Sequence, residues 1–264
     1  MDNELKIMHS ICLTLIVFCF LNLAAFAEST EITTFELGGA SNSPGIASNG
    51  ELIIEEDFFH YQSKFAGKTS YNYQLGQTKL RYGLIQRRLE ARMTSAGLAL
   101  NPIDSGLSNI SLGTKIRVLD ESKYLPSTEI IGDWEIPAGD PDLRNPGFDH
   151  SYMLLLGKAW TKKFGSIINW SVDFASFKSE TGVGGIVSMP VVFNINYYFK
   201  PELNVFSHIY GTHYFTGGID DPLSVDLGFS YALTKDLVLI SWISKGLNDA
   251  AQDMTVDLGF VYRP

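Results

Sequence analysis

The sequence predicts an all-β fold: a transmembrane, antiparallel, up-and-down β-barrel of about twelve strands, of the outer-membrane type. Three observations predict it. Segment after segment alternates apolar with polar residues, the connections are alternately short and long, and charged residues gather on the face opposite the apolar one. After Phe26 no apolar run approaches the roughly 20 residues that a membrane helix needs.

The first 27 residues are typical of an export signal. Ile11–Leu21 is a short apolar stretch, and the small-x-small pattern of residues 25–27 precedes Glu28, which predicts cleavage after residue 27. The residues before the apolar stretch are net negative rather than basic. Translation from Met8 would remove that departure, so the sequence leaves open whether the chain starts at Met1 or at Met8.

Cysteine usage and charge narrow the class further. Both cysteines, Cys12 and Cys19, fall within the predicted signal, so the mature chain is expected to have no disulfide, no cysteine metal site and no thiol nucleophile. The net charge of -9 excludes the basic excess of a nucleic-acid-binding protein.

Residues 28–50 are rich in Ser, Gly, Asn and Thr and show no sustained period. They are interpreted as a periplasmic N-terminal tail that can fold into the barrel mouth as a plug. Residues 51–264 are interpreted as the β-barrel domain.

Strand alternation is clearest near the C-terminus. Val225, Leu227, Phe229 and Tyr231 share one face, with polar residues and Gly228 on the other. Segments near 51–61, 152–160, 203–212 and 237–244 alternate less clearly. The predicted strands are 51–61, 78–82, 88–93, 110–118, 129–136, 152–160, 168–174, 191–197, 203–212, 225–231, 237–244 and 256–262.

The connections alternate in length, as periplasmic turns and outside loops do in outer-membrane barrels. The short ones are 84–87, 120–126, 161–165, 200–202 and 234–236. The long ones are 62–72, 95–108, 137–150, 176–188, 213–223 and 245–252. Aromatic residues at strand ends beside the short turns predict a girdle at the lipid–water boundary, formed by Tyr82, Trp160, Tyr198, Phe199, Tyr231 and Tyr262.

The polar face predicts where the interior lies. Charged residues on it would line the lumen if the apolar face contacts lipid. The candidate lumen-lining residues are Lys79, Arg81, Arg88, Glu90, Arg92, Lys115, Arg117, Glu129, Asp133 and Glu135. Two hypotheses stay open: a basic wall beside an acidic one that orients polar solutes across an open lumen, or ion pairs that fill a closed interior.

No catalytic or metal-binding residue is predicted. His150 and Ser151 are the only adjacent candidates for a lipid hydrolase. His208 and His213 lack a third metal ligand at a suitable spacing. The Asp-rich stretches 139–142 and 220–222 are typical of turns, although calcium ligation is an alternative.

Several motifs resemble one family. "LRYGLIQRRLEARM", "GLSNISLGTKIRVLDES", "IIGDWEIPAGD", "LGFSYALTKDL" and "SKGLNDAAQDMTVDLGFVYR" resemble the family described as "Putative MetA-pathway of phenol degradation", over most of residues 51–263. Its members are outer-membrane barrels often regarded as transporters. The resemblance implies such a barrel and implies no enzyme.

The resulting hypothesis is an outer-membrane channel or transporter for small, aromatic or otherwise poorly soluble compounds. The alternatives are a non-transporting structural or ligand-binding barrel and, third, a lipid-modifying enzyme. The expected partners are outer-membrane lipid and lipopolysaccharide, the barrel-assembly machinery and a small-molecule solute, with no nucleic acid and no cofactor. The substrate, the oligomeric state and whether the lumen is open or plugged do not follow from the sequence.

Overall fold

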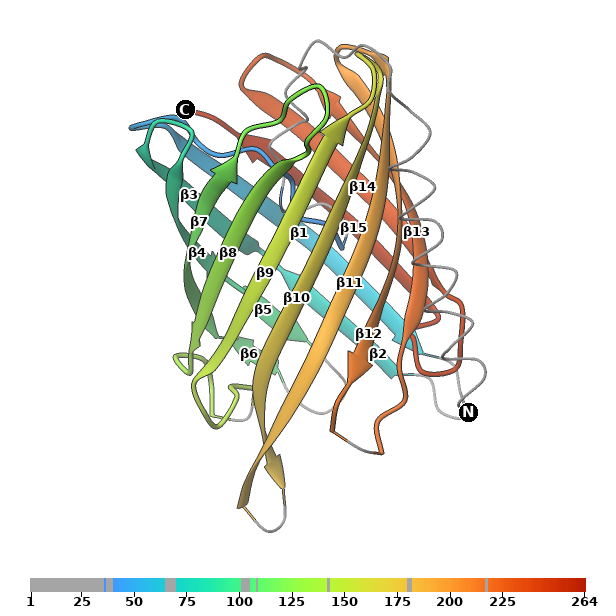
Figure 1. Ribbon diagram of the computed structural model, residues 1–264. Helices are drawn as coiled ribbons and strands as arrows, with labels where there is room; N and C mark the ends of the chain where they lie inside the picture. Colours follow the sequence, from blue (N-terminus) through green and yellow to red (C-terminus); the bar gives the residue numbers. More distant parts are fainter. Residues whose placement is uncertain are drawn as a thin grey trace.

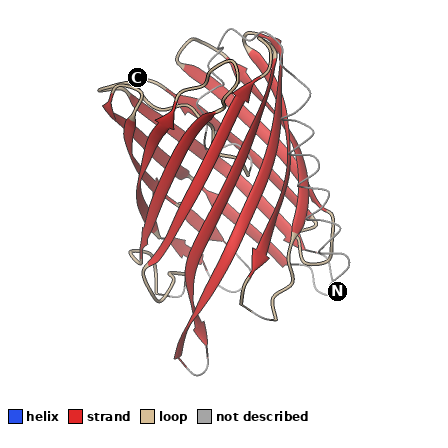
Figure 2. Ribbon diagram, viewed as in Figure 1, coloured by secondary structure: helices blue, strands red, loops and turns tan. Residues whose placement is uncertain are grey.

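In the computed structural model the chain forms a closed barrel of tilted strands (Figures 1 and 2). The structure describes residues 36, 40–64, 70–100, 105–107, 109–141, 143–179, 182–216 and 218–264. The predicted signal peptide, residues 1–27, lies outside these ranges. Among the described residues there is no helix with the length and apolar character needed to span a membrane.

Neighbouring strands pair antiparallel in an up-and-down order, and β15 pairs with β1 to close the sheet. The strands are β1 (Leu52–Lys64), β2 (Ser70–Leu75), β3 (Gln77–Ile85), β4 (Leu89–Ser95), β5 (Leu98–Leu100), β6 (Ser105–Leu107), β7 (Ile110–Leu119), β8 (Ser127–Ile136), β9 (Asp149–Ala159), β10 (Phe164–Ser179), β11 (Gly182–Lys200), β12 (Leu203–Tyr214), β13 (Leu223–Ala232), β14 (Leu237–Gly246) and β15 (Met254–Tyr262).

Three barrel strands are interrupted near the ends that lie away from the short turns. Gly76 separates β2 from β3 and Gly97 separates β4 from β5, each with a positive φ that breaks the ladder. β6 and β7 are likewise two parts of one barrel strand, because β6 pairs with β5, β7 pairs with β4, and β4 and β5 are consecutive. Counted this way, the described residues form twelve barrel strands, as the sequence predicts.

The apolar face points outward. On β13, Leu227 is 57% exposed and Phe229 44%, while the alternate residues Asp226 and Ser230 are 2% and 3% exposed. An apolar outer surface around a polar interior is the arrangement of a transmembrane barrel, because lipid rather than water surrounds the outer face. The predicted orientation of the two faces is confirmed.

The connections alternate in length only in part. Residues 137–150, 213–223 and 245–252 contain long connections as predicted, between β8 and β9, β12 and β13, and β14 and β15. Residues 62–72 and 95–108 are not long loops, because β1 pairs with β2 as far as Lys64 and Ser70, and β5 pairs with β6 within 95–108. Residues 176–188 are not a long loop either, because β10 and β11 continue as a paired hairpin to Ser179 and Gly182. This hairpin extends beyond the other strands on the side away from the short turns (Figure 1). The Phe177 ring lies over Gly184, its cross-strand partner, and this packing supports a strand that the glycine-rich sequence alone would weaken.

The aromatic girdle is present in part. Tyr82, Phe199, Tyr231 and Tyr262 are exposed on the outer face near the short turns. Tyr198 does not belong to it, because it pairs in register with Asn204 and shares the inner face. The prediction placed two consecutive residues in one girdle, whereas consecutive strand residues face opposite sides.

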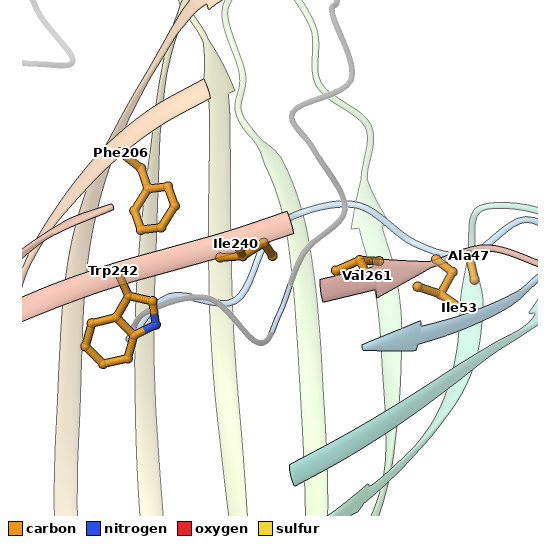
Figure 3. Packing of buried hydrophobic residues seen from close by; sticks show 6 residues of the cluster. All are labelled: Ala47, Ile53, Phe206, Ile240, Trp242 and Val261. Carbon is orange, nitrogen blue, oxygen red and sulfur yellow. The ribbon is translucent and has the colours of Figure 1, made fainter. Parts of the chain in front are cut away.

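The interior also holds apolar residues, which the sequence analysis did not place there. One cluster joins Ala47 of the tail to residues of β1, β12, β14 and β15 (Figure 3). Its other members are Ile53, Phe206, Ile240, Trp242 and Val261. A second cluster consists of Ile131, Leu155, Ala159 and Ile167. Both include residues near the short turns, so this half of the interior is packed as well as charged.

Candidate functional site in the barrel interior

Most of the charged residues predicted to line the lumen are buried inside the barrel, on the neighbouring strands β3, β4, β7 and β8. The buried ones are Lys79, Arg81, Glu90, Arg92, Lys115 and Glu129. Arg117, Asp133 and Glu135 are partly exposed. Arg88 does not belong to this set of inward-facing residues. It lies in the turn before β4, where the chain reverses at Arg87 with a φ of 50°. Its side chain is exposed and pairs with Asp120.

Arg81 is the centre of the charged cluster and is fully buried. Its Nε donates to Glu90 Oε1 at 2.8 Å and its Nη2 to Glu90 Oε2 at 2.9 Å, a bidentate pair across β3 and β4. Its Nη1 donates to Glu55 Oε1 on β1 at 2.9 Å. A planar guanidinium suits such a network, because its five donors form a rigid fork.

Of the three acidic residues of β8, Glu129 and Asp133 lie beside cations, whereas Glu135 contacts side-chain amides. Arg117 Nε donates to Glu129 Oε1 at 3.0 Å across β7 and β8. Asp133 Oδ1 lies 3.7 Å from Arg92 Nε, and Glu135 accepts a hydrogen bond from Asn145 Nδ2 at 3.1 Å. The charges are therefore paired locally, and of the two hypotheses the ion-pair network describes them better than two separated walls.

The carboxylate at the middle of this network comes from the tail. Glu36 is buried, and its Oε1 lies 2.7 Å from Lys115 Nζ and 3.6 Å from Arg81 Nη2. Its Oε2 lies 2.9 Å from Arg92 Nη2 and 3.6 Å from Lys79 Nζ. Burial disfavours ionisation of Glu36, but these four cations outweigh it and hold its pKa well below the usual range. Glu36 is therefore a carboxylate in this state.

The rest of the tail is held by its backbone. Lys115 Nζ donates to the carbonyl oxygens of Ser43 and Gly45 at 2.5 and 2.7 Å, and Arg117 Nη2 donates to that of Pro44 at 2.6 Å. These bonds satisfy buried carbonyl groups that have no sheet partner.

The tail also reaches the far side of the interior. The backbone N–H of Asn42 donates to Asn169 Oδ1 on β10 at 2.5 Å. In the sheet, β10 and β3 are separated by β9, β8, β7 and β4. Because one short segment contacts both Arg81 on β3 and Asn169 on β10, it crosses the space enclosed by these strands.

An aromatic row lies on strands outside this charged cluster. Phe206 on β12, Gly228 on β13 and Trp242 on β14 are paired in register. A Cβ at Gly228 would lie 2.4 Å from Phe206 Cζ and 2.6 Å from Trp242 Cβ, so the missing side chain provides room for both neighbours. Trp242 Nε1 is buried and has no hydrogen-bond partner among the described residues.

Two His–Asp pairs continue this side of the interior. His208 Nδ1 lies 2.7 Å from Asp226 Oδ2, and His60 Nδ1 lies 2.9 Å from Asp257 Oδ2. His208 also stacks on Phe206, with 5.0 Å between ring centroids. Apolar rings and hydrogen-bonding groups therefore occur together here.

The structure gives no support to the metal and hydrolase alternatives. His213 pairs with Asp221, and no group of three metal-ligating side chains occurs within the described ranges. His150 and Ser151 are consecutive residues of β9 and therefore point to opposite faces, which separates the pair that a hydrolase would need. The His150 ring stacks on Phe174 instead, at 4.7 Å.

Sequence reasoning missed two parts of the site. Glu36 lies in a tail without periodicity, so no pattern marks it as inward-facing. Its one signal is that residues 37–50 carry no charge, which makes Glu36 the acidic group that precedes Glu51 in the sequence. Phe206 and Trp242 lie on strands whose two faces are both partly apolar, so alternation could not assign them to the interior.

Comparison with known proteins gives a family and a fold. The model of the family described as "Putative MetA-pathway of phenol degradation" matches residues 38–263. No curated protein sequence matches the chain.

Three solved structures share the barrel. An outer membrane channel of the COG4313 group from Pseudomonas putida F1 has a TM-score of 0.69 at 12% identity, covering 87% of this chain and 100% of that one. The NanC porin has a TM-score of 0.57 at 10% identity, covering 81% and 99%. The translocator domain of the autotransporter NalP from Neisseria meningitidis has a TM-score of 0.53 at 12% identity, covering 82% and 89%. At these identities the likeness establishes the fold alone.

Proposed function

The chain belongs to the family described as "Putative MetA-pathway of phenol degradation", and from this membership and the barrel geometry we propose that it is an outer-membrane channel for small, aromatic or otherwise poorly soluble compounds. The observation that carries the proposal is a closed barrel with an apolar outer face and a polar interior. Closure leaves no unpaired strand edge for lipid to meet, and a twelve-strand barrel is wider than the ~8-strand barrels that side chains fill completely.

The aromatic row supports the class of solute. Phe206 and Trp242 place two aromatic rings in the interior, where Phe206 stacks on His208, and Trp242 Nε1 is a buried donor without a partner among the described residues. A ligand with an aromatic ring and a hydrogen-bond acceptor would match both features, since buried apolar contacts supply affinity and a few polar groups fix orientation.

The tail, residues 28–50, is proposed to act as a plug that narrows the lumen. The contacts of Glu36 and of residues 42–47 with β3, β4, β7 and β10 support this role. The same contacts favour a second candidate function, a barrel that does not transport and whose interior is permanently filled.

Placement in the cell follows from the proposed function. We expect export by a signal peptide cleaved after Ala27, short turns in the periplasm, and the longer loops outside. The outer face would contact outer-membrane lipid and lipopolysaccharide, and the barrel-assembly machinery would insert the chain.

Planar-bilayer recordings in KCl test the proposal. The purified barrel should conduct, and a variant without residues 28–46 should conduct more, because the segment that crosses the interior is gone. Heat-modifiability on a gel verifies that both barrels are folded. If both folded proteins remain silent, the channel is wrong and the filled structural barrel is favoured.

A further inference from the structure

We propose that the four cations around Glu36 form a carboxylate-binding site of the channel, which the tail occupies in this structure and which a carboxylate-bearing solute takes by displacing Glu36. The inference rests on the proposed function and adds a chemical class of solute to it. The cations are Lys79, Arg81, Arg92 and Lys115, on three adjacent strands.

The site is built for a carboxylate. Lys115 Nζ and Arg92 Nη2 contact different oxygens of Glu36, at 2.7 and 2.9 Å, so the carboxylate is bound from two sides. All four cationic side chains are buried, so water screens the interaction little. A carboxylate that reaches this position meets positive charge already arranged by the strands.

The charge balance explains why the site would not stay empty. The cluster contains the five cations Lys79, Arg81, Arg92, Lys115 and Arg117. Its five carboxylates are Glu36, Glu55, Glu90, Glu129 and Asp133. Only Glu36 comes from outside the strands, so its departure leaves one cation in excess. A buried uncompensated charge is costly, and a solute anion would restore the balance.

Arg92 shows that Glu36 does not use all the binding capacity. Its Nε and Nη1 are buried and have no hydrogen-bond acceptor within the described part of the chain. Nη1 and Nη2, or Nε and Nη2, can bind both oxygens of one carboxylate. A free carboxylate can turn to meet this fork, whereas Glu36 is restrained by the bond from its own N–H to Glu55 Oε2 at 2.8 Å.

The tail is suited to be a displaceable competitor. Among the tail residues that the structure describes, 36 and 40–50, only Glu36 carries a charge, so it is the single ionic attachment of this part of the tail. A tethered group that occupies the site reduces the apparent affinity of any free ligand in proportion to its occupancy. Removing the Glu36 charge should therefore strengthen the binding of a carboxylate and leave a neutral analogue unaffected.

Calorimetric titration of the detergent-solubilised full-length barrel tests the site, with benzoate as the probe and benzyl alcohol as its neutral counterpart. Benzoate should bind Glu36→Gln about tenfold or more tightly than wild type, because a charge-assisted competitor is lost. Benzyl alcohol should bind both equally. Adding Arg92→Gln to Glu36→Gln should weaken benzoate again, with Lys79→Gln as the substitute if the Arg92 variant does not fold. Arg88→Gln, at the exposed pair, is the matched control and should change nothing.

Equal benzoate affinity in wild type and Glu36→Gln would overturn the inference, as would an equal gain for benzyl alcohol. KCl currents from the same preparations separate this inference from the proposed function. Currents together with an unchanged benzoate affinity reject the carboxylate site alone. Folded barrels that pass no current reject the channel, and the benzoate titrations then test the carboxylate site independently.

Discussion

Replacing Glu36 by Gln should release the tail from its site while the barrel stays folded. The substitution removes the tail carboxylate that contacts all four of Lys79, Arg81, Arg92 and Lys115. Removing one partner of a buried ion pair costs about 3–5 kcal/mol. Because each 1.4 kcal/mol is a factor of ten, even about 3 kcal/mol raises the undocked fraction of the tail roughly 150-fold.

Thiol labelling measures that fraction. Both natural cysteines lie in the predicted signal peptide, so a Ser43→Cys variant should carry one thiol after processing. Ser43 is buried, and its Oγ has no hydrogen-bond partner among the described residues, so sulfur in place of oxygen disturbs little. A maleimide should react slowly with Ser43→Cys and about 100-fold faster when Glu36→Gln is added, if labelling follows the undocked population.

Arg88→Gln in the Ser43→Cys background is the matched control. It breaks an exposed ion pair, which contributes about 0–1 kcal/mol, so the labelling rate should not change. Equal rates with and without Glu36→Gln would refute the reasoning, because Glu36 would then not hold the tail.

Three further outcomes are expected. Leu227→Arg or Phe229→Arg should impair folding into lipid vesicles by about 2–4 kcal/mol, since both residues are on the outer face. Ser230→Arg, on the inner face, should be tolerated better. Equal damage at Ser230 would mean that the faces are reversed. Replacing Arg81, Arg92 and Lys115 by Glu should lower the temperature at which the folded band is lost on a gel. The reason is that Glu36, Glu55 and Glu90 would then face like charges. Unchanged heat resistance would contradict the ion-pair network. The contribution of Glu36, whose folded pKa is lowered, should be complete above its ordinary pKa and lost as pH falls through the folded value. The labelling difference between Ser43→Cys with and without Glu36→Gln should therefore stay constant across the neutral range, where the thiolate reacts with maleimide. A difference that disappears near neutral pH would contradict this.

The barrel could be predicted from the sequence because its strands have one face in lipid and one in a polar interior. That contrast produces clean alternation on β13, where Leu227 and Phe229 point out and Asp226 and Ser230 point in. On β14 the contrast fails, since Ile240 and Trp242 are inward and Leu239 and Ile243 outward, so both faces read as apolar. The alternation pattern therefore could not predict the interior aromatic row.

The ionic site was predicted only in part, for a different reason. Arg81, Arg92 and Lys115 lie on strands, so their spacing assigned them to the polar face. Their partner Glu36 lies in a segment without regular structure, and its position depends on long-range contacts that no local period records. Arg88 was misplaced because alternation was extended through the turn at Arg87, where the backbone reverses.

A reversible lock on the tail tests the central claim most directly. Asn42 N–H contacts Asn169 Oδ1, so cysteines at these two positions lie close enough to be joined by a short reducible dithiol cross-linker that fixes the tail across the interior. Both natural cysteines lie in the predicted signal peptide, so no other thiol is expected after processing. In planar bilayers the locked barrel should pass little current in KCl, and a reducing agent should restore wild-type conductance within the same recording. A locked barrel that conducts like wild type would contradict the claim that the tail controls the channel. Silence before and after reduction, with wild type also silent, would contradict the channel itself.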